Sequence, residues 1–366
     1  MRHRRPQEGN MIRFRPEIAA ALSILALAAC AQTGTAAPPV VPSSPQQIAE
    51  AAQAPAGWRP FSADSPWNTK IPSDAPVDPG STEFMAQVAS DNALYINIRE
   101  WTVATYYIDA KTTPKRRVFP IFQTVQGRGF EPGTRIPAPD FATPSGPAGG
   151  TEFLAMIDPE AGKAWEMHQP RMNEEDGNWL TTFGAVIDLE GTGVPSPWMK
   201  AETPADAVAS RPSAIPLIAG LIRLDEIKAG RIDHALAFAY PTPRTDRFVA
   251  PAGGALESGP DRPENHFGLP MGARIQLDPS YDIENTRLSA NAKIVARALQ
   301  EYGAILVEEA GATTLFAEGS PAQIDAWKGV LSPGDLQLLF TPEMMRENFR
   351  VLELGEQMPG RPEAMR

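Results

Sequence analysis

Cysteine and histidine are scarce in this chain of 366 residues. The single cysteine, Cys30, lies near the N-terminus, so the rest of the chain has no disulfide, no thiol nucleophile and no cysteine ligand for a metal. This excludes cysteine hydrolases, zinc ribbons and iron–sulfur proteins. Three histidines follow Cys30, at positions 168, 234 and 266, and none belongs to a His-Glu-x-x-His motif. We therefore expect no metal site and no cofactor.

Signatures of several common enzyme classes are also missing. The sequence has no Gly-x-Ser-x-Gly elbow, no Walker loop and no dinucleotide-binding fingerprint. These absences disfavour a serine mechanism on an α/β-hydrolase fold and disfavour nucleotide binding. No internal repeat occurs at a fixed period, which argues against a propeller.

The first 29 residues resemble the leader of a bacterial lipoprotein. Arg13 and Arg15 supply positive charge, and residues 18–29 form an apolar run of twelve residues. That run is too short for a transmembrane helix, which needs about 20 residues. It ends Leu-Ala-Ala directly before Cys30, in the manner of a lipobox. Either Met1 or Met11 serves as the start, because Arg13 and Arg15 already provide the charge.

The lipobox resemblance implies that Cys30 carries the lipid after cleavage. Two or more acyl chains give stable anchoring to a membrane. The next residue is Ala31 rather than aspartate, which the resemblance links to the outer membrane. Whether the protein faces the periplasm or the cell surface stays open.

The leader takes positive charge with it. Residues 1–29 hold five arginines and two glutamates, a net charge of +3, so removing them changes the net charge from −11 to −14. A strongly negative protein repels phosphate backbones. We therefore expect no nucleic-acid partner.

The remaining chain divides by composition. Residues 30–56 comprise Cys30 and a tether rich in Ala, Pro, Gln, Ser and Thr, which buries too little apolar surface to fold. Bulky apolar residues appear from Gly57 onward, and no second linker follows. We predict one globular domain over residues 57–355 and a disordered tail over residues 356–366.

Frequent glycine and proline between short apolar runs favour many short strands. Residues 153–157 with 164–168 predict a hairpin, and residues 304–307 with 313–317 predict another around Gly311. Other strands are predicted at residues 95–98, 103–108, 183–189, 232–240 and 273–277.

Helices are expected to be fewer. Residues 289–302 form the clearest one, with Ser289 as N-cap and Gly303 as the stop. Shorter helices are predicted at residues 215–229 and 321–330. The pattern predicts a mainly β fold, with a large β-sandwich or jelly-roll-like core and a few peripheral helices.

The sequence also resembles a family of uncharacterised exported bacterial proteins. The likeness begins at Ser65-Pro66-Trp67-Asn68 and is strongest over a segment of the pattern GLIR…EI..GRI.HAL, residues 220–236. After Asp188 the sequence departs from the family pattern. The family carries no assigned reaction, so the resemblance implies export but no catalytic residues.

Candidate catalytic residues are Glu166, Asp188 and His234. Glu166 and His168 lie on the same side of a predicted strand, which faces water or a groove if Trp165 and Met167 face the core. Asp188 lies in an apolar run, where a carboxylate is either functional or caps the following turn.

His234 alternates with apolar neighbours on its predicted strand, so it is either a satisfied structural histidine or a general acid or base. The expected substrate-binding residues are Trp67, Asn68, His168 and Arg274.

These residues favour a lipid-anchored protein that acts on a polysaccharide or envelope glycan. One hypothesis is a glycoside hydrolase that uses Glu166 and Asp188 as its paired carboxylates, assisted by His234. A second is a non-catalytic glycan-binding or envelope-scaffold protein. A third is a polysaccharide lyase with His234 as base and Arg274 neutralising a uronate. The residues do not decide whether the protein is an enzyme.

Overall fold

A computed structural model describes most of the chain beyond the leader. The described residues are 51, 53–89, 94–98, 100–121, 129–146, 150–200, 210–256, 258, 262–320 and 323–360. They all belong to one compact unit, residues 41–366. The leader, Cys30, most of the tether and the last six residues lie outside the described residues.

The fold is mainly β, as the sequence predicts. Strands account for 27% of the residues and helices for 15%, and the core is sandwich-like. The strands form one six-stranded sheet, two four-stranded sheets and a two-stranded ribbon.

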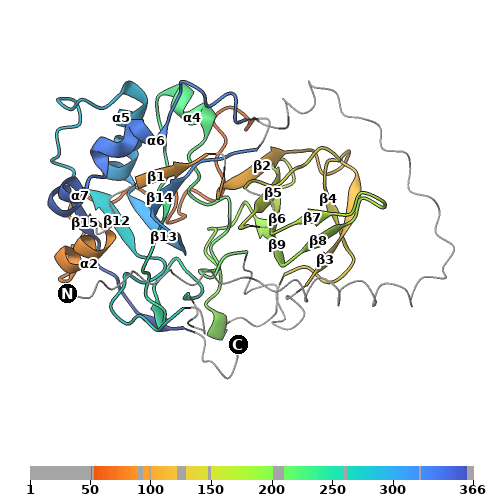
Figure 1. Ribbon diagram of the computed structural model, residues 1–366, viewed down its shortest axis with the longest axis horizontal. Helices are drawn as coiled ribbons and strands as arrows, with labels where there is room; N and C mark the ends of the chain where they lie inside the picture. Colours follow the sequence, from red (N-terminus) through yellow and green to blue (C-terminus); the bar gives the residue numbers. More distant parts are fainter. Residues whose placement is uncertain are drawn as a thin grey trace, which may run out of the picture. The chain divides into compact units, whose positions relative to one another are not determined.

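The two four-stranded sheets form the sandwich (Figure 1). The one here called the inner sheet has the order β2 (Val103–Tyr107), β5 (Phe153–Asp158), β6 (Lys163–His168) and β9 (Phe183–Asp188). The outer sheet has the order β4 (Thr134–Pro137), β3 (Lys115–Pro120), β8 (Trp179–Thr181) and β7 (Arg171–Met172). The predicted hairpin of β5 and β6 is confirmed.

Strands β2 and β5 of the inner sheet are buried on both faces, and this explains their apolar runs. Leu154 and Met156 of β5 point into the sandwich core with Trp179. Phe153 and Ile157, on the alternate positions, point into a second and larger core. The inner sheet is therefore the middle layer between two cores.

The larger core is shared with the six-stranded sheet, here called the mixed sheet. Its order is β1 (Leu94–Asn97), β14 (Thr313–Phe316), β10 (Leu236–Tyr240), β13 (Ala304–Glu309), β12 (Arg274–Leu277) and β15 (Phe349–Val351). The ribbon pairs β11 (Arg247–Phe248) with β16 (Met358–Pro359).

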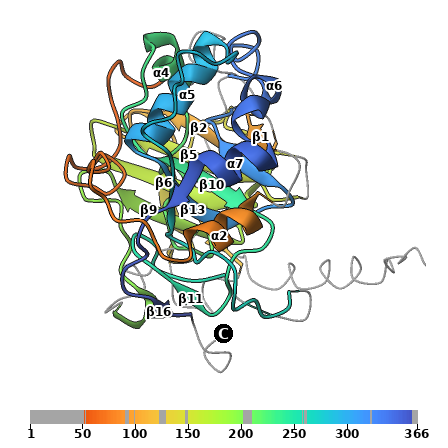
Figure 2. The ribbon, with the colours of Figure 1, turned by 90° about the vertical axis from the view of Figure 1, so that its left-hand side faces the viewer.

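Short helices accompany the mixed sheet (Figure 2). Helix α5 (Ala290–Glu301) packs on β12, and α2 (Ser81–Val88) and α7 (Pro342–Asn348) pack on β15. Helix α5 matches the prediction: Ser289 caps it by accepting a hydrogen bond from the amide of Ala292. The remaining helical elements are α4 (Leu224–Ala229), α6 (Pro333–Leu336) and the 3-10 turns η2 (Trp198–Lys200) and η4 (Gln337–Leu339).

Several predicted elements are wrong in detail. Strands β13 and β14 are not a hairpin, because the fully buried β10 lies between them in the sheet. Only Leu224–Ala229 of the predicted helix 215–229 is helical, since Gly220 adopts φ +71° in the segment before it. Residues 323–330 form turns instead of a helix, and β10 begins at Leu236 rather than at residue 232.

The folded region is also longer than predicted at both ends. Ala51 and Ala54 already pack against the cores, because alanine can be buried without the bulky apolar signal that marked Gly57. At the other end, β16 lies within the predicted tail.

Residues 211–222, here called the linking segment, lie between the inner sheet and the mixed sheet. Its backbone accepts a hydrogen bond at Gly220 from Ala237 of β10, and Ile222 donates one to Phe316 of β14. A Cβ atom on Gly220 would lie 2.5 Å from the amide nitrogen of Ala237 and 2.7 Å from the indole of Trp67. Only glycine fits this position.

Gly220→Ala should therefore lower the free energy of unfolding by about 2–4 kcal/mol, from left-handed strain plus overpacking. Gly329→Ala is the matched control, since Gly329 has φ +73° but no atom within 4 Å of the place that a Cβ would occupy. Its free energy of unfolding should fall by only about 1 kcal/mol, because backbone strain alone acts there. Urea unfolding measures both variants, and equal losses would contradict the close contact.

Candidate functional site

Glu166 is buried, not exposed in a groove as the sequence predicts. Its side chain is 0% exposed on β6, between Ala155 and Ala185 of the neighbouring strands. Its two carboxyl oxygens accept hydrogen bonds from the amides of Leu217 (2.8 Å) and Ile218 (3.0 Å) in the linking segment. The prediction was wrong because the linking segment covers this face of the strand.

Asp188 lies at the exposed end of β9. Its carboxyl accepts a hydrogen bond from the amide of Glu190 (3.0 Å), so it caps the following turn. The strand register pairs Asp188 with Lys163 and Ala185 with Glu166, which places the two carboxyl groups on opposite faces of the sheet. They do not form the predicted catalytic pair.

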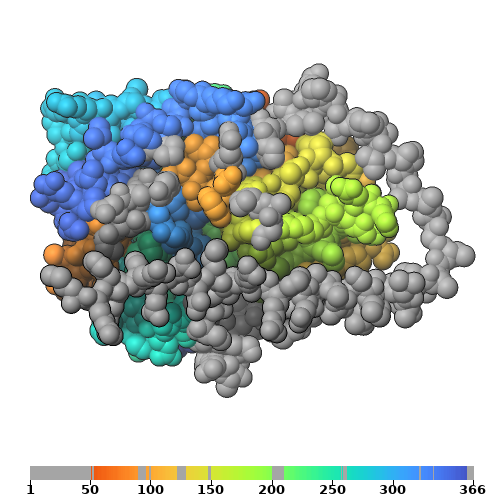
Figure 3. Space-filling model, in the orientation of Figure 1, coloured from red at the N-terminus to blue at the C-terminus, as the bar shows by residue number. Residues whose placement is uncertain are grey.

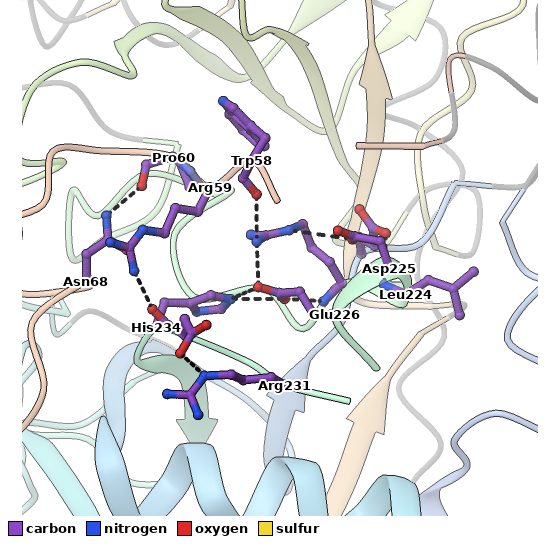
Figure 4. Close-up of polar contacts among 12 residues, drawn as sticks. Trp58, Arg59, Pro60, Asn68, Leu224, Asp225, Glu226, Arg231 and His234 are labelled. Atoms are coloured by element: carbon purple, nitrogen blue, oxygen red, sulfur yellow. Dashed lines mark hydrogen bonds and ion pairs between the residues drawn. The ribbon is translucent and has the colours of Figure 1, made fainter. Parts of the chain in front are cut away.

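His234 is buried beside α4, where it meets neither of the other two candidates. Its Nε2 lies 3.1 Å from the carboxyl of Glu226, and its Nδ1 lies 2.9 Å from the carbonyl of Ala235 (Figure 4). Although burial acts to raise it, the pKa of Glu226 is held below its ordinary value by His234 and Arg223. These contacts fasten α4 to the start of β10.

Three of the predicted substrate-binding residues also have structural contacts. Trp67 is buried in the larger core. Asn68 donates hydrogen bonds to the carbonyls of Pro60 and Phe61, and Arg274 donates one to the carbonyl of Pro66. The Ser-Pro-Trp-Asn element is therefore a turn that packs against the mixed sheet.

A pocket of about 910 Å³ opens where the inner sheet meets the mixed sheet. Of the predicted site residues, His168 alone lines it. On the face shown in Figure 3, orange residues lie between the blue residues of the mixed sheet and the yellow-green residues of the sandwich. The residues that line the pocket include Trp101, Phe153, His168, Phe183, Arg211, Arg262, Glu308, Glu309 and Phe316.

A row of three rings from adjacent strands forms one side of the pocket. The register pairs Phe153 with His168 and His168 with Phe183, with ring centroids 5.2 Å and 6.2 Å apart. The Nδ1 atom of His168 lies 2.6 Å from the hydroxyl of Thr182. Burial lowers the pKa of His168 to about 4, so the ring is neutral at neutral pH.

Two consecutive glutamates, Glu308 and Glu309, also line the pocket, at the end of β13. A register shift against β10 leaves Val307 unpaired in the ladder, and Glu308 and Glu309 follow it into the pocket wall. Such bulges redirect side chains beside functional sites. The predicted site did not include this pair. The sequence does carry a signal for it, because two glutamates end an apolar strand.

The two carboxyl groups have different surroundings. Glu309 forms an ion pair with Arg262, whose Nη2 lies 2.6 Å from the carboxylate. Glu308 accepts a hydrogen bond from the amide of Glu309 (3.1 Å), and burial raises its pKa to about 7 although Arg211 acts to lower it. Glu309 is thus ion-paired with a cation, whereas burial favours the protonated form of Glu308.

Trp101 stands beside the pocket with 51% of its surface exposed. Its backbone has φ +52°, a left-handed conformation unusual for a large side chain, and Asn97 donates a hydrogen bond to its carbonyl (3.0 Å). Strained residues of this kind concentrate at functional sites.

Within the described ranges, no three His, Cys, Asp or Glu side chains gather as a metal site would require. No described helix is long and apolar enough to cross a membrane. Comparison with protein-family models, curated proteins and solved structures finds no match for this chain. The family resemblance noted above therefore stays a prediction.

The buried carboxyl of Glu166 makes stability depend on pH. Burial raises its pKa to about 7, from an ordinary value of 4.5, so the folded protein retains a proton that the unfolded chain releases. This contribution to stability is fully present below pH 4.5 and is lost as the pH rises through 7. Glu308 and Glu318 act in the same direction, and His168 in the opposite one.

The free energy of unfolding should fall between pH 5 and pH 8, and Glu166→Gln should reduce this fall by about 2 kcal/mol. Unfolding by urea at several pH values measures the slope. Asp188→Asn is the control, since it makes the matching carboxyl-to-amide change at an exposed position. A slope unaltered by Glu166→Gln would contradict the account.

Proposed function

We propose that this protein acts on glycans in the pocket between the two sheets, as a glycoside hydrolase. The observation that carries the proposal is the pair of consecutive residues Glu308 and Glu309 in the pocket wall, where burial raises the pKa of Glu308 to about 7 and Glu309 forms an ion pair with Arg262. Glycoside hydrolysis uses two carboxyl groups beside the scissile bond, one of which donates a proton to the leaving group.

The pocket also suits a sugar in size and lining. Ligand pockets commonly enclose about 300–1,000 Å³, and this one has about 910 Å³. The exposed ring of Trp101 offers a surface on which the apolar face of a sugar ring can stack. The row of Phe153, His168 and Phe183 offers further ring surface.

In this proposal Glu308 donates its proton to the oxygen of the scissile glycosidic bond. A general acid works best when its pKa lies near the working pH, as a value of about 7 does. As the glycosidic bond to that oxygen breaks, water adds to the sugar carbon, and Glu309, ion-paired with Arg262, is the second carboxyl group of the site. Activity should fall as the pH rises above 7, because Glu308 then loses the proton.

Glu308→Gln should lower turnover by about 10²–10⁴-fold, the usual contribution of a general acid, and leave binding intact. The assay measures release of reducing ends from a polysaccharide panel by the whole chain in detergent. The control is Glu160→Gln, which removes an exposed carboxyl in the turn between β5 and β6. Binding without turnover would favour a glycan-binding protein, and unsaturated uronate products would show a lyase instead.

We also propose that the protein is lipid-anchored through Cys30 in the outer membrane. Support comes from the leader and the lipobox-like residues before Cys30.

Cys30→Ser should abolish lipidation, because the thiol is the acceptor and the chain has no other cysteine. Metabolic labelling with an alkyne fatty acid measures the modification. Label that persists in the variant would overturn the anchor.

A further inference from the structure

The wall of the pocket contains a buried cation that the proposed chemistry does not use. Arg211 is 2% exposed, and all three of its guanidinium nitrogens lack a hydrogen-bond partner among the described residues. The group packs over the rings of Phe316 and Phe153, with centroids 4.9 Å and 5.8 Å away. It thus bridges the mixed sheet and the inner sheet.

The neighbouring acidic groups do not satisfy this cation. Glu166 directs its oxygens to the amides of Leu217 and Ile218. Within the described part of the chain, neither Glu166 nor Glu308 forms an ion pair with Arg211. Aromatic contacts recover only part of the free energy lost when a guanidinium leaves water.

Because the N–H groups of Arg211 in the pocket wall lack an acceptor, we expect a ligand to supply one. A guanidinium presents five N–H bonds in a planar fork that matches a carboxylate in two parallel hydrogen bonds. The second arginine lining the pocket, Arg262, is engaged with Glu309. Arg211 is therefore the better placed of the two to bind an anionic group.

We propose that Arg211 binds the carboxylate of the ligand, so that the glycan recognised by the pocket contains an acidic sugar of the uronate class. The sugar assignment rests on the proposed function, whereas the need for a carboxylate rests on Arg211. Because the guanidinium nitrogens are shielded from water, binding includes a shift of a neighbouring side chain.

Glu308 is the neighbour free to make this shift, since its only described hydrogen bond comes from the backbone of Glu309. Because Glu308 lies beside Arg211, its proton is close to an acidic sugar that Arg211 binds. Recognition and proton donation thus share one wall of the pocket.

The test compares oligogalacturonate with its methyl ester, which has the same rings without the charge. Titration calorimetry on the whole chain in detergent measures both. We expect the acid to bind at least tenfold more tightly than the ester. Arg211→Met should abolish this preference, so that the acid binds no more tightly than the ester.

Stability separates ligand binding from a structural role. Replacing an unpaired buried charge by an apolar side chain of similar length is neutral or stabilising. Arg211→Met should therefore melt at the same temperature as the native chain or higher. Arg247→Met, an exposed arginine on β11 outside the pocket, is the control and should keep the preference for the acid.

Each outcome bears on a different claim. Equal binding of acid and ester, or binding of neutral glycans alone, would overturn the acidic-sugar inference and leave the proposed function in place. A preference for the acid that survives in Arg211→Met would also overturn it. Absence of binding to every acidic and neutral glycan would overturn the proposed function as well.

Discussion

The linking segment holds the fold together by occupying the space between two sheets. It gives its amides at Leu217 and Ile218 to the buried carboxyl of Glu166 on one side, and it bonds to β10 and β14 on the other. Backbone amides buried at a sheet face need acceptors, and Glu166 supplies them. Because Gly220 allows the close approach to Ala237, the inner sheet and the mixed sheet share one core.

The pocket follows from that arrangement. Arg211, at the start of the linking segment, lies between Phe153 of the inner sheet and Phe316 of the mixed sheet. Glu308 and Glu309 line the same pocket as the row of Phe153, His168 and Phe183. Titratable groups are thus held in a largely apolar setting, where burial raises the pKa of Glu308.

Local pattern predicted much of the secondary structure but little of the site. The β5–β6 hairpin and α5 are encoded by alternation, a turn and a cap, all within about 20 residues. The pairing of β13 with β10 depends on contacts across about 70 residues, which periodicity does not report. Glu166 stood out as a polar residue among apolar neighbours, yet whether it faced water depended on residues 217 and 218. Glu308 and Arg211 gave no local signal of meeting at one pocket.

A structure of the whole chain with a bound oligouronate tests the central claim most directly. The account predicts the sugar in the pocket between the inner sheet and the mixed sheet, with its carboxylate on the guanidinium of Arg211 and a glycosidic oxygen within hydrogen-bond distance of Glu308. A ligand bound elsewhere, for example beside Asp188 or over the Trp67 turn, with Arg211 and Glu308 untouched, would contradict it.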